Sequence, residues 1–412
     1  MGAFTLRRDG LFRQKAKQQL DVLIHAGRVP IARHRGALPA YERLLWHVRS
    51  RTNLLHPSDR AGDNRSLVNA GLIDLALHHA DWIRSVEIWQ PVNQSVWPLF
   101  SSLAQHLLAR HPVPAFMTSV WLDQSLGKRL PQQEWYKHLG RGENIRTAKL
   151  PLRLTKAMAH WFTQAPHHLS AIQAIRWAQV RGLGDSKHLA RAVVATRLGK
   201  VLENEDFWES VVHSFINHPS LDFARLGPVV DFLQHQRFEW REGVTQAGVF
   251  GKIPPPQPQY TMKGRTVASI LRQVEEWHKE LGKEDKPTIM WRHSPIRDFR
   301  FIEGSEALGN MRAWTISELL STRALFLEGQ AMRHCVATYG DECVRREVSI
   351  WSMQIETDRG QHRVLTIEVD MPTRTIWQVR GKCNRLPSAG ELAIVERWAA
   401  AEGLKVAEAI RI

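Results

Sequence analysis

The sequence predicts a mainly α protein that ends in a small α+β domain. Apolar residues recur at helical spacing from about residue 40 to 250, prolines cluster between residues 251 and 260, and the apolar period falls from 3.6 to 2 after residue 350. A chain of 412 residues is also long for one hydrophobic core, so two or three domains are expected. We predict a helical region over 1–250, a Pro-rich linker over 251–260, and a linking helix with the α+β domain over 261–412.

The N-terminal region has the pattern of helices packed as hairpins. Residues 67–77 repeat Leu, Val and Ile at intervals of three and four residues. Short interruptions that contain Pro, Gly or Asn separate such segments, at 112–114, 182–185 and 217–220. Several segments pair a late Trp with one of these turns, but no fixed period supports a solenoid. We therefore predict that this region is nearly all helical and that strands are confined mainly to residues 345–380.

Residues 251–260 have a different character. Their four prolines lack backbone N–H donors and favour the extended polyproline II conformation, which is typical of a stiff connector or a domain boundary. A proline-rich ligand for an SH3-type domain is the alternative interpretation. Beyond this segment, residues 267–281 place Val, Ile, Leu and Trp on one side of an amphipathic helix.

Two helices are expected at the start of the α+β domain. Thr315 and Glu318 have the spacing of a capping box, which predicts a helix from there to about Phe326, and Gly329 can end it. A second helix is predicted with one apolar stripe made of Met332, Cys335, Val336, Tyr339 and Cys343.

Three short segments then alternate apolar and polar residues. They centre on Met353, Ile367 and Trp377, and two turns separate them. This pattern predicts a three-stranded antiparallel meander with one buried face, and helices that cover that face. Ser388 and Glu391 form a further capping box at the start of a closing helix.

The charge balance indicates the kind of partner. The formal net charge is +15, and a field of this sign attracts polymers that carry phosphate groups, acidic proteins or anionic surfaces. Nucleic acid, either DNA or RNA, is the partner we expect first, with an acidic protein as the alternative. Three cysteines, no secretory signal and no run of about 18 apolar residues lead us to expect a cytoplasmic protein without a membrane segment.

Several separated motifs resemble those of the PcfJ-like proteins of bacterial mobile elements. The resemblance covers roughly residues 290–400 and is carried by the segments 291–296, 316–319, 328–336 with Tyr339, 349–352, 365–368 and 378–385. Members of this family lie on plasmids, phages and other mobile elements. The resemblance therefore implies a mobile-element setting, and it implies no reaction, metal or cofactor.

The adjacent pair His334 and Cys335 suggests a thiol nucleophile, but helical geometry argues against it. Successive residues of a helix point about 100° apart, so His334 cannot readily activate the thiol of its neighbour. We expect Cys335 to be a small buried apolar residue. No pair of short-spaced Cys or His ligands is present in this domain, so neither a metal nor another cofactor is expected.

A basic loop lies between the last predicted strand and the closing helix. Arg380, Lys382, Asn384 and Arg385 offer cations and an amide, and Gly381 permits close approach of a ligand to the backbone. The N-terminus of the following helix adds backbone N–H donors, so the loop suits a phosphate or a carboxylate. The alternative is that Asn384 and Arg385 hold the loop together by bonding to backbone carbonyls and to Glu328 or Glu368.

Two functional hypotheses follow from these residues. In the first, the protein binds nucleic acid without catalysis. In the second, it is an enzyme acting on nucleic acid or a nucleotide, in which Glu328 and His334 converge with Arg380 and Asn384, and Glu368 is the general base. Both hypotheses place the 328–339 helix beside the 380–385 loop.

Overall fold

A computed structural model describes the chain from residue 21 onward, except for positions 23, 26, 30, 185 and 335 and the segments 56–64, 92–94, 123–129, 219–220, 245–249, 282–287, 305–310, 358–359, 383–384, 408–409 and 411–412. The chain divides into two compact units, Met1–Ala178 and Gln179–Ile412.

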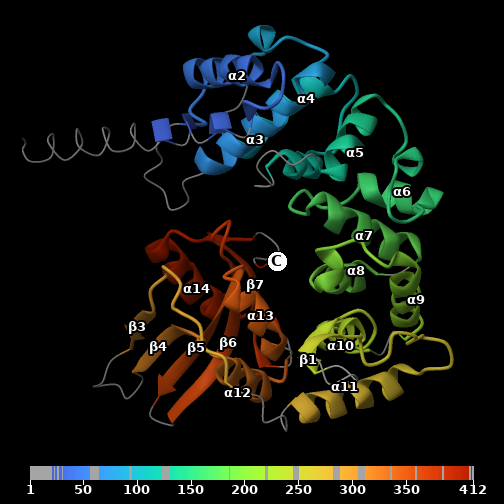
Figure 1. Cartoon of the computed structure of the whole chain (residues 1–412), viewed down its shortest axis with the longest axis vertical. Coiled ribbons are helices and arrows are strands. Elements are labelled where there is room, and N and C mark those ends of the chain that lie inside the picture. Colours follow the sequence, from blue (N-terminus) through green and yellow to red (C-terminus); the bar gives the residue numbers. More distant parts are fainter. Residues whose placement is uncertain are drawn as a thin grey trace, which may run out of the picture. The chain divides into compact units, whose positions relative to one another are not determined.

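The described elements of the first unit are all helices. Its α-helices are α2 (Ala37–Arg51), α3 (Arg65–Leu77), α4 (Val96–Leu108), α5 (Pro131–Gly140), α6 (Lys156–Thr163) and α7 (Ala171–Gly182), which crosses the boundary between the units (Figure 1). Its 3-10 helices are η1 (His79–Asp81), η2 (Val86–Ile88), η3 (Ala115–Trp121) and η4 (Ile145–Thr147). The interruption predicted at 112–114 separates α4 from η3.

Helix α3 is at the centre of the first unit. All ten residues from Val68 to Leu77 are buried, so this helix has no polar face toward solvent. Helix α2 packs against it and buries only the side that carries Tyr41, Leu44 and Val48. The hydroxyl of Tyr41 donates a hydrogen bond to Oδ1 of Asn69 (2.5 Å), which joins the two helices through a buried polar contact.

The second unit begins with more helices and a small hairpin. The helices are α8 (Lys187–Val194), η5 (Arg197–Gly199), α9 (Glu205–Ile216), η6 (Phe223–Arg225), α10 (Leu226–Arg237) and α11 (Val267–Leu281). Between α10 and α11, β1 (Arg241–Val244) pairs antiparallel with β2 (Phe250–Ile253). The helical prediction is therefore confirmed for most of residues 21–250 and is wrong for this hairpin.

The proline segment that follows β2 is attached to α10. The amide of Gln257 donates to the carbonyl of Gln236 (2.7 Å), and the buried ring of Tyr260 lies edge-on to Phe232. Prolines remove donors from the segment, so it is held by the few amides that remain and by this aromatic contact.

A six-stranded mixed sheet forms the centre of the C-terminal part (Figure 1). Its strands follow one another in chain order: β3 (Phe299–Glu303), β4 (Arg312–Glu318), β5 (Val348–Thr357), β6 (Gly360–Asp370), β7 (Thr375–Arg380) and β8 (Lys405–Val406). All neighbours are antiparallel except β7 and β8, which are parallel. The prediction of a three-stranded meander is thus wrong, because the meander β5–β6–β7 is only the middle of a larger sheet.

The capping-box prediction at Thr315 failed because a strand occupies these residues. Trp314 and Ile316 point into the core while Thr315 and Ser317 alternate with them, so burial of two large apolar side chains outweighs a local capping signal. The helix begins later: α12 spans Thr322–Met332, and Oγ of Ser321 accepts the amide of Ala324 (3.1 Å).

The predicted second helix is also divided. Arg333 ends α12 in the left-handed region (φ 55°), and two short helices follow, η8 (Val336–Tyr339) and α13 (Gly340–Val344). The closing helix α14 (Ala389–Glu402) begins as predicted. The side chains of Ser388 and Glu391 each accept the other residue's backbone amide.

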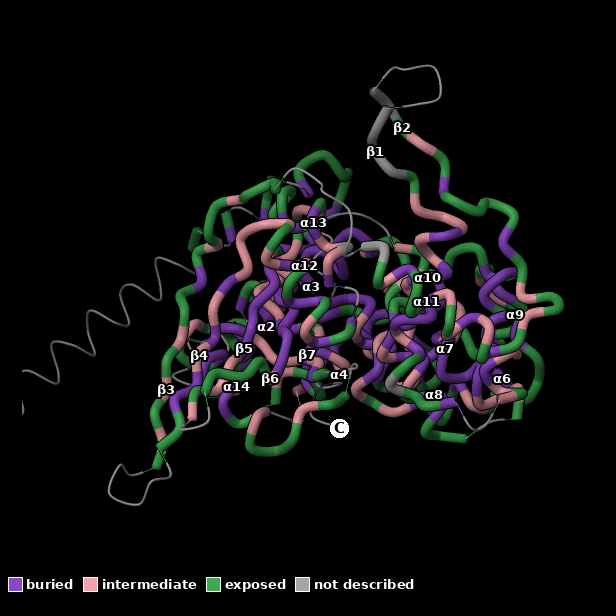
Figure 2. Tube along the Cα trace, turned by 90° about the horizontal axis from the view of Figure 1, so that it is seen from below, coloured by how far each residue is buried: buried purple, intermediate pink, exposed green. Residues whose placement is uncertain are grey.

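Helices cover both faces of the sheet, not one. On one face, Trp351, Met353 and Ile367 pack against Val395 and Trp398 of α14 in the main apolar core. On the other face, α12 packs on β6 and α13 on β5, and a smaller apolar cluster forms around Leu325, Val336, Cys343 and Ile350. Figure 2 shows the resulting buried stretches in β5, β6 and β7.

The pairing of two tryptophans gives a test of the main core. Trp398 is fully buried, and its ring lies 4.9 Å from that of Trp351. We expect Trp398→Ala to lower the free energy of unfolding of the second unit by about 3–5 kcal/mol, because it leaves a large cavity. Trp377→Ala on β7, where the ring is exposed, should cost less than about 1 kcal/mol. Chemical denaturation of both variants checks this, and equal losses would contradict the assignment of the core.

Candidate functional site

The face of the sheet under α12 carries polar residues that are buried. Ser352 on β5, Thr366 on β6 and Arg380 on β7 are direct cross-strand neighbours, and Glu368 lies two residues beyond Thr366 on the same face. Ser352, Thr366 and Glu368 are buried. The sheet therefore presents hydroxyl groups and a carboxylate to α12, where an exposed face would present them to water.

Glu328 of α12 is the centre of this polar layer. Its side chain is fully buried, and its two oxygens accept hydrogen bonds from the hydroxyls of Ser352 (2.9 Å) and Thr366 (2.7 Å) and from Nε of Arg363 (2.8 Å). Burial raises the pKa of Glu328, and these three donors oppose that shift. The carboxylate thus has a complete set of protein donors and faces no solvent.

His334 lies against the same hydroxyl. Its Nε2 is 2.8 Å from Oγ1 of Thr366, and because Thr366 donates to Glu328, we assign Nε2 of His334 as the donor. Burial lowers the pKa of His334 to about 4, so the imidazole is neutral at pH 7. Glu328, Thr366 and His334 form one buried chain of hydrogen bonds.

Glu368 belongs to a second polar group. Its Oε1 lies 2.8 Å from Nζ of Lys200, which follows η5, and its Oε2 accepts the hydroxyl of Tyr339 (3.3 Å). Burial lowers the pKa of Arg380, whereas Glu368 and Tyr339 raise it. The structure therefore brings Glu368 close to Arg380, and it engages Glu368 with partners that the sequence did not indicate.

The basic loop is held mainly by its own side chains. Both terminal nitrogens of Arg385 bond to the carboxylate of Glu391 (2.6 and 2.7 Å), and the amide of Gly381 donates to the carbonyl of Arg385 (2.9 Å). A Cβ on Gly381 would lie 2.7 Å from the Arg385 side chain, so the glycine admits this arginine. The partner of Arg385 is thus Glu391, not Glu328 or Glu368, and this geometry supports a structural role for Arg385.

The remaining predicted residues fall into two classes. Lys382 is exposed and has no ion pair within the part of the chain that the structure describes. Asn384, Cys335 and Cys383 lie outside the described residues, so the predicted burial of Cys335 stays a prediction. Cys343 is buried, which raises the pKa of its thiol to about 12 and makes it a poor nucleophile.

The sequence interpretation missed Ser352, Arg363, Thr366, Lys200 and Tyr339 as partners of the candidate residues. On β5 and β6 the polar positions were assigned to solvent, because an exposed strand face shows the same alternation. The available signal was the presence of small hydroxyl residues, which can be buried when a charged acceptor lies opposite.

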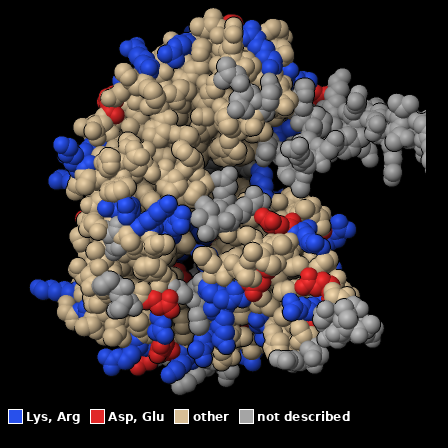
Figure 3. Space-filling view, turned by 180° about the vertical axis from the view of Figure 1, so that it is seen from behind, with Lys and Arg blue, Asp and Glu red and all other residues tan. Residues whose placement is uncertain are grey.

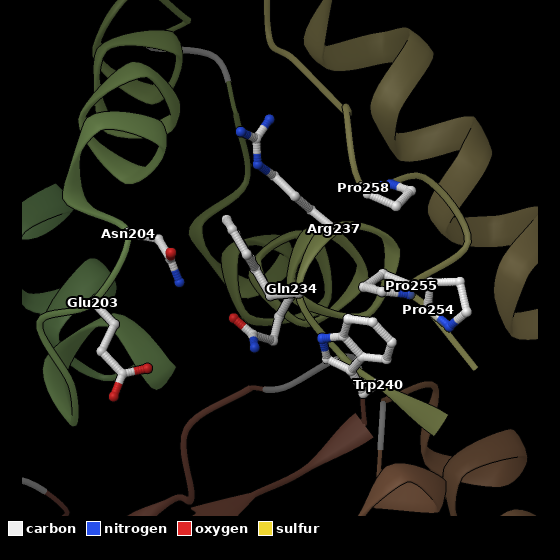
Figure 4. Close-up of a pocket in the computed structure, with 9 residues that line it drawn as sticks. Glu203, Asn204, Gln234, Arg237, Trp240, Pro254, Pro255 and Pro258 are labelled. Carbon is white, nitrogen blue, oxygen red and sulfur yellow. The ribbon is translucent and has the colours of Figure 1, made fainter. Parts of the chain in front are cut away.

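A shallow groove lies elsewhere in the second unit. It encloses about 550 Å³ and is lined by residues of the segment before α9, the C-terminal end of α10 and the proline segment. Trp240, Pro254 and Pro255 lie together along it, and Glu203 and Asn204 come from the opposite element (Figure 4). None of the residues predicted as a site lines this groove.

Two searches of the described residues returned nothing. Among them, no three His, Cys, Asp or Glu side chains are grouped so that they could bind a metal ion. None of the described helices has both the length and the apolar character needed to cross a bilayer.

The Glu328–Arg363 pair predicts a pH-dependent variant. Arg363→Met leaves the buried carboxylate without its cation and should lower the free energy of unfolding by about 3 kcal/mol at pH 7. Lowering the pH should recover part of this loss, because protonation removes the buried charge. Adding Glu328→Gln to Arg363→Met should also recover part of it. Hydrogen exchange of peptides from β5 and β6 measures the effect, with the exposed Arg312→Met as the control. No recovery in either case would contradict the charge assignment.

His334 predicts a second pH effect, of defined sign. Its pKa is about 4 in the fold and 6.5 in its ordinary state, so the unfolded chain binds a proton first as the pH falls. The contribution is fully present above pH 6.5 and is lost toward pH 4, by about 3 kcal/mol in all. His334→Gln should lack this loss, whereas His362→Gln, an exposed residue of β6, should keep it. Hydrogen exchange of β6 between these pH values decides, and equal slopes for the two variants would refute it.

Comparison with known proteins agrees with the C-terminal architecture. The family model of the PcfJ-like proteins matches residues 278–394, which include β3 to β7, α12, α13 and the first part of α14. No curated protein and no solved structure matches the chain. The matched segment contains Glu328, His334, Glu368 and the loop from Arg380 to Arg385. Residues 278–394 of this chain are a PcfJ-like domain.

Proposed function

We propose that the protein binds nucleic acid without catalysing a reaction on it, through a basic surface in residues 1–178. The observation that carries the proposal is the uneven distribution of charge. Residues 1–178 contain 24 Lys and Arg against 11 Asp and Glu, a net charge of +13, out of +15 for the whole chain. Residues 278–412 contain 20 Lys and Arg against 19 Asp and Glu.

One stretch of the first unit shows this excess most directly. Arg146, Lys149, Arg153 and Lys156 are exposed, and none of them pairs with an acidic side chain in the described part of the chain. Nε of Arg146 donates to the carbonyl of Leu154 (3.2 Å), which fixes the stem of that side chain. We call these four residues the basic segment. Such cations favour phosphate because binding releases the counterions condensed on a nucleic acid.

The charged surface is visible in part. On the face shown in Figure 3, Lys and Arg form more extensive patches than Asp and Glu. A mobile-element setting, which the PcfJ-like resemblance implies, supports the same class of partner. We place the protein in the cytoplasm under this proposal, since its sparse cysteines suit a reducing compartment.

The enzymatic alternative has less support from the geometry. The carboxylate of Glu328 already accepts three hydrogen bonds, and His334 is buried beside it. Glu368 is paired with Lys200, and Arg385 with Glu391. A general acid or base must reach a substrate, and these groups reach one another.

The basic segment gives the test. Replacing all four of its cations by Gln should weaken binding to a random-sequence duplex and to a single strand. The slope of log K against log salt should fall by up to about 0.9 for each lost contact on duplex and about 0.7 on single strand. Fluorescence anisotropy from about 50 to about 200 mM salt measures both quantities.

A charge-matched variant is the control. Arg292, Arg300, Arg312 and Lys382 are exposed residues of the C-terminal part, and their replacement by Gln removes the same charge. We expect this variant to bind nearly as the wild type does. If it lost binding while the basic-segment variant kept it, the basic surface would lie elsewhere. No binding by the wild type at low salt would end the nucleic-acid proposal and favour an acidic protein as the partner.

A further inference from the structure

Helix α2 exposes a large aromatic side chain. Trp46 is 63% exposed, although the same helix buries Tyr41, Leu44 and Val48 on its opposite side. Its ring is in edge contact with His47, with 4.7 Å between the ring centroids, and is otherwise available on the surface. Leaving an indole in water forgoes the free energy that its burial would provide. Its position in the basic unit suggests that a ligand covers it.

Arginines lie on either side of this tryptophan. Arg43 and Arg49 are three residues before and after it, so both neighbour it on the helix surface, and both are exposed. The guanidinium of Arg43 lies 5.9 Å from the centroid of the Trp82 ring. Cations and aromatic planes thus alternate across this surface, which we call the α2 face.

Acidic residues on the α2 face are few and engaged. Oε1 of Glu42 is 3.1 Å from Arg28, and Oε1 of Glu87 is 4.0 Å from both Arg43 and His47. Arg51 donates to the carbonyls of Glu87 and Trp89 (3.0 and 2.8 Å), which holds η2 against α2. The net character of the surface remains cationic.

We propose that the α2 face binds single-stranded nucleic acid, with a base stacked on Trp46 and the backbone phosphates held by Arg43 and Arg49. This inference depends on the proposed function and names its substrate class. A stacking indole needs a base whose flat face is accessible, which a single strand offers and an intact duplex hides. Arginines beside the ring supply the attraction for phosphate.

The test compares two exposed tryptophans of the same unit. Trp46→Ala should weaken binding to an oligothymidine of about 20 nucleotides by about 5- to 150-fold, as expected for the loss of one stacked base. Binding to duplex DNA should change by less than about twofold, because the basic segment remains. Trp46→Phe should retain most of the affinity, since a smaller aromatic ring still stacks. An oligouridine of the same length should respond in the same way, because stacking requires no deoxyribose.

Trp97→Ala is the matched control. Trp97 of α4 is 46% exposed, and no Lys or Arg lies three or four residues from it in sequence. This variant should bind both ligands as the wild type does. Circular dichroism of every variant reports whether it folds, and Trp46→Phe serves as the test if Trp46→Ala does not. A strand that carries 2-aminopurine should also change its fluorescence on binding to wild type and not to Trp46→Ala.

The outcomes separate this inference from the proposed function. Unchanged single-strand affinity in Trp46→Ala, with weakened binding by the basic-segment variant, would overturn the stacking site and leave nucleic-acid binding in place. Equal losses on single strand and duplex would also overturn it, because the residue would then act on both forms alike. Wild-type protein that binds neither ligand at low salt would overturn both proposals.

Discussion

The carboxylate of Glu328 is fully buried, and the need to surround it with donors governs how α12 lies on the sheet. Moving an ionised carboxylate out of water costs several kcal/mol unless hydrogen bonds and an opposite charge replace its hydration. Here β5 provides Ser352, and β6 provides Arg363 and Thr366. A shift of the strands by one residue would turn both hydroxyls to the other face and leave the charge without partners.

This requirement explains why the two faces of the sheet differ. The face under α14 is apolar and gains its stability from burial of large side chains such as Trp351 and Trp398. The face under α12 combines the small cluster around Leu325 and Ile350 with a layer of hydrogen bonds. Hydrogen bonds depend on direction, whereas apolar contacts largely do not. The polar face therefore fixes register, and the apolar face supplies most of the buried area.

The amino-acid sequence predicted the elements whose period is unambiguous. The helices of the first unit, the strands β5 to β7 and the start of α14 all follow from spacing and capping residues. Strand β4 was missed because Thr315 and Glu318 imitate a capping box, and only the opposing strands β3 and β5 make Trp314 and Ile316 core residues. The polar contacts were missed because a buried hydroxyl and an exposed one give the same pattern. Spacing within one strand does not identify the residue that lies above it.

The sheet ends differently on its two sides. Strand β8 has two residues and pairs in parallel with β7, while β3 has five residues and pairs with β4 along its length. Very short terminal strands offer few free amides and carbonyls, and natural sheets use them to prevent association with other chains. Strand β3 has no such protection from its length, and the side chain of Ile302 on it is largely exposed. Association of the domain through backbone pairing would therefore begin at β3, where the charge of Arg300 is the local feature that opposes it.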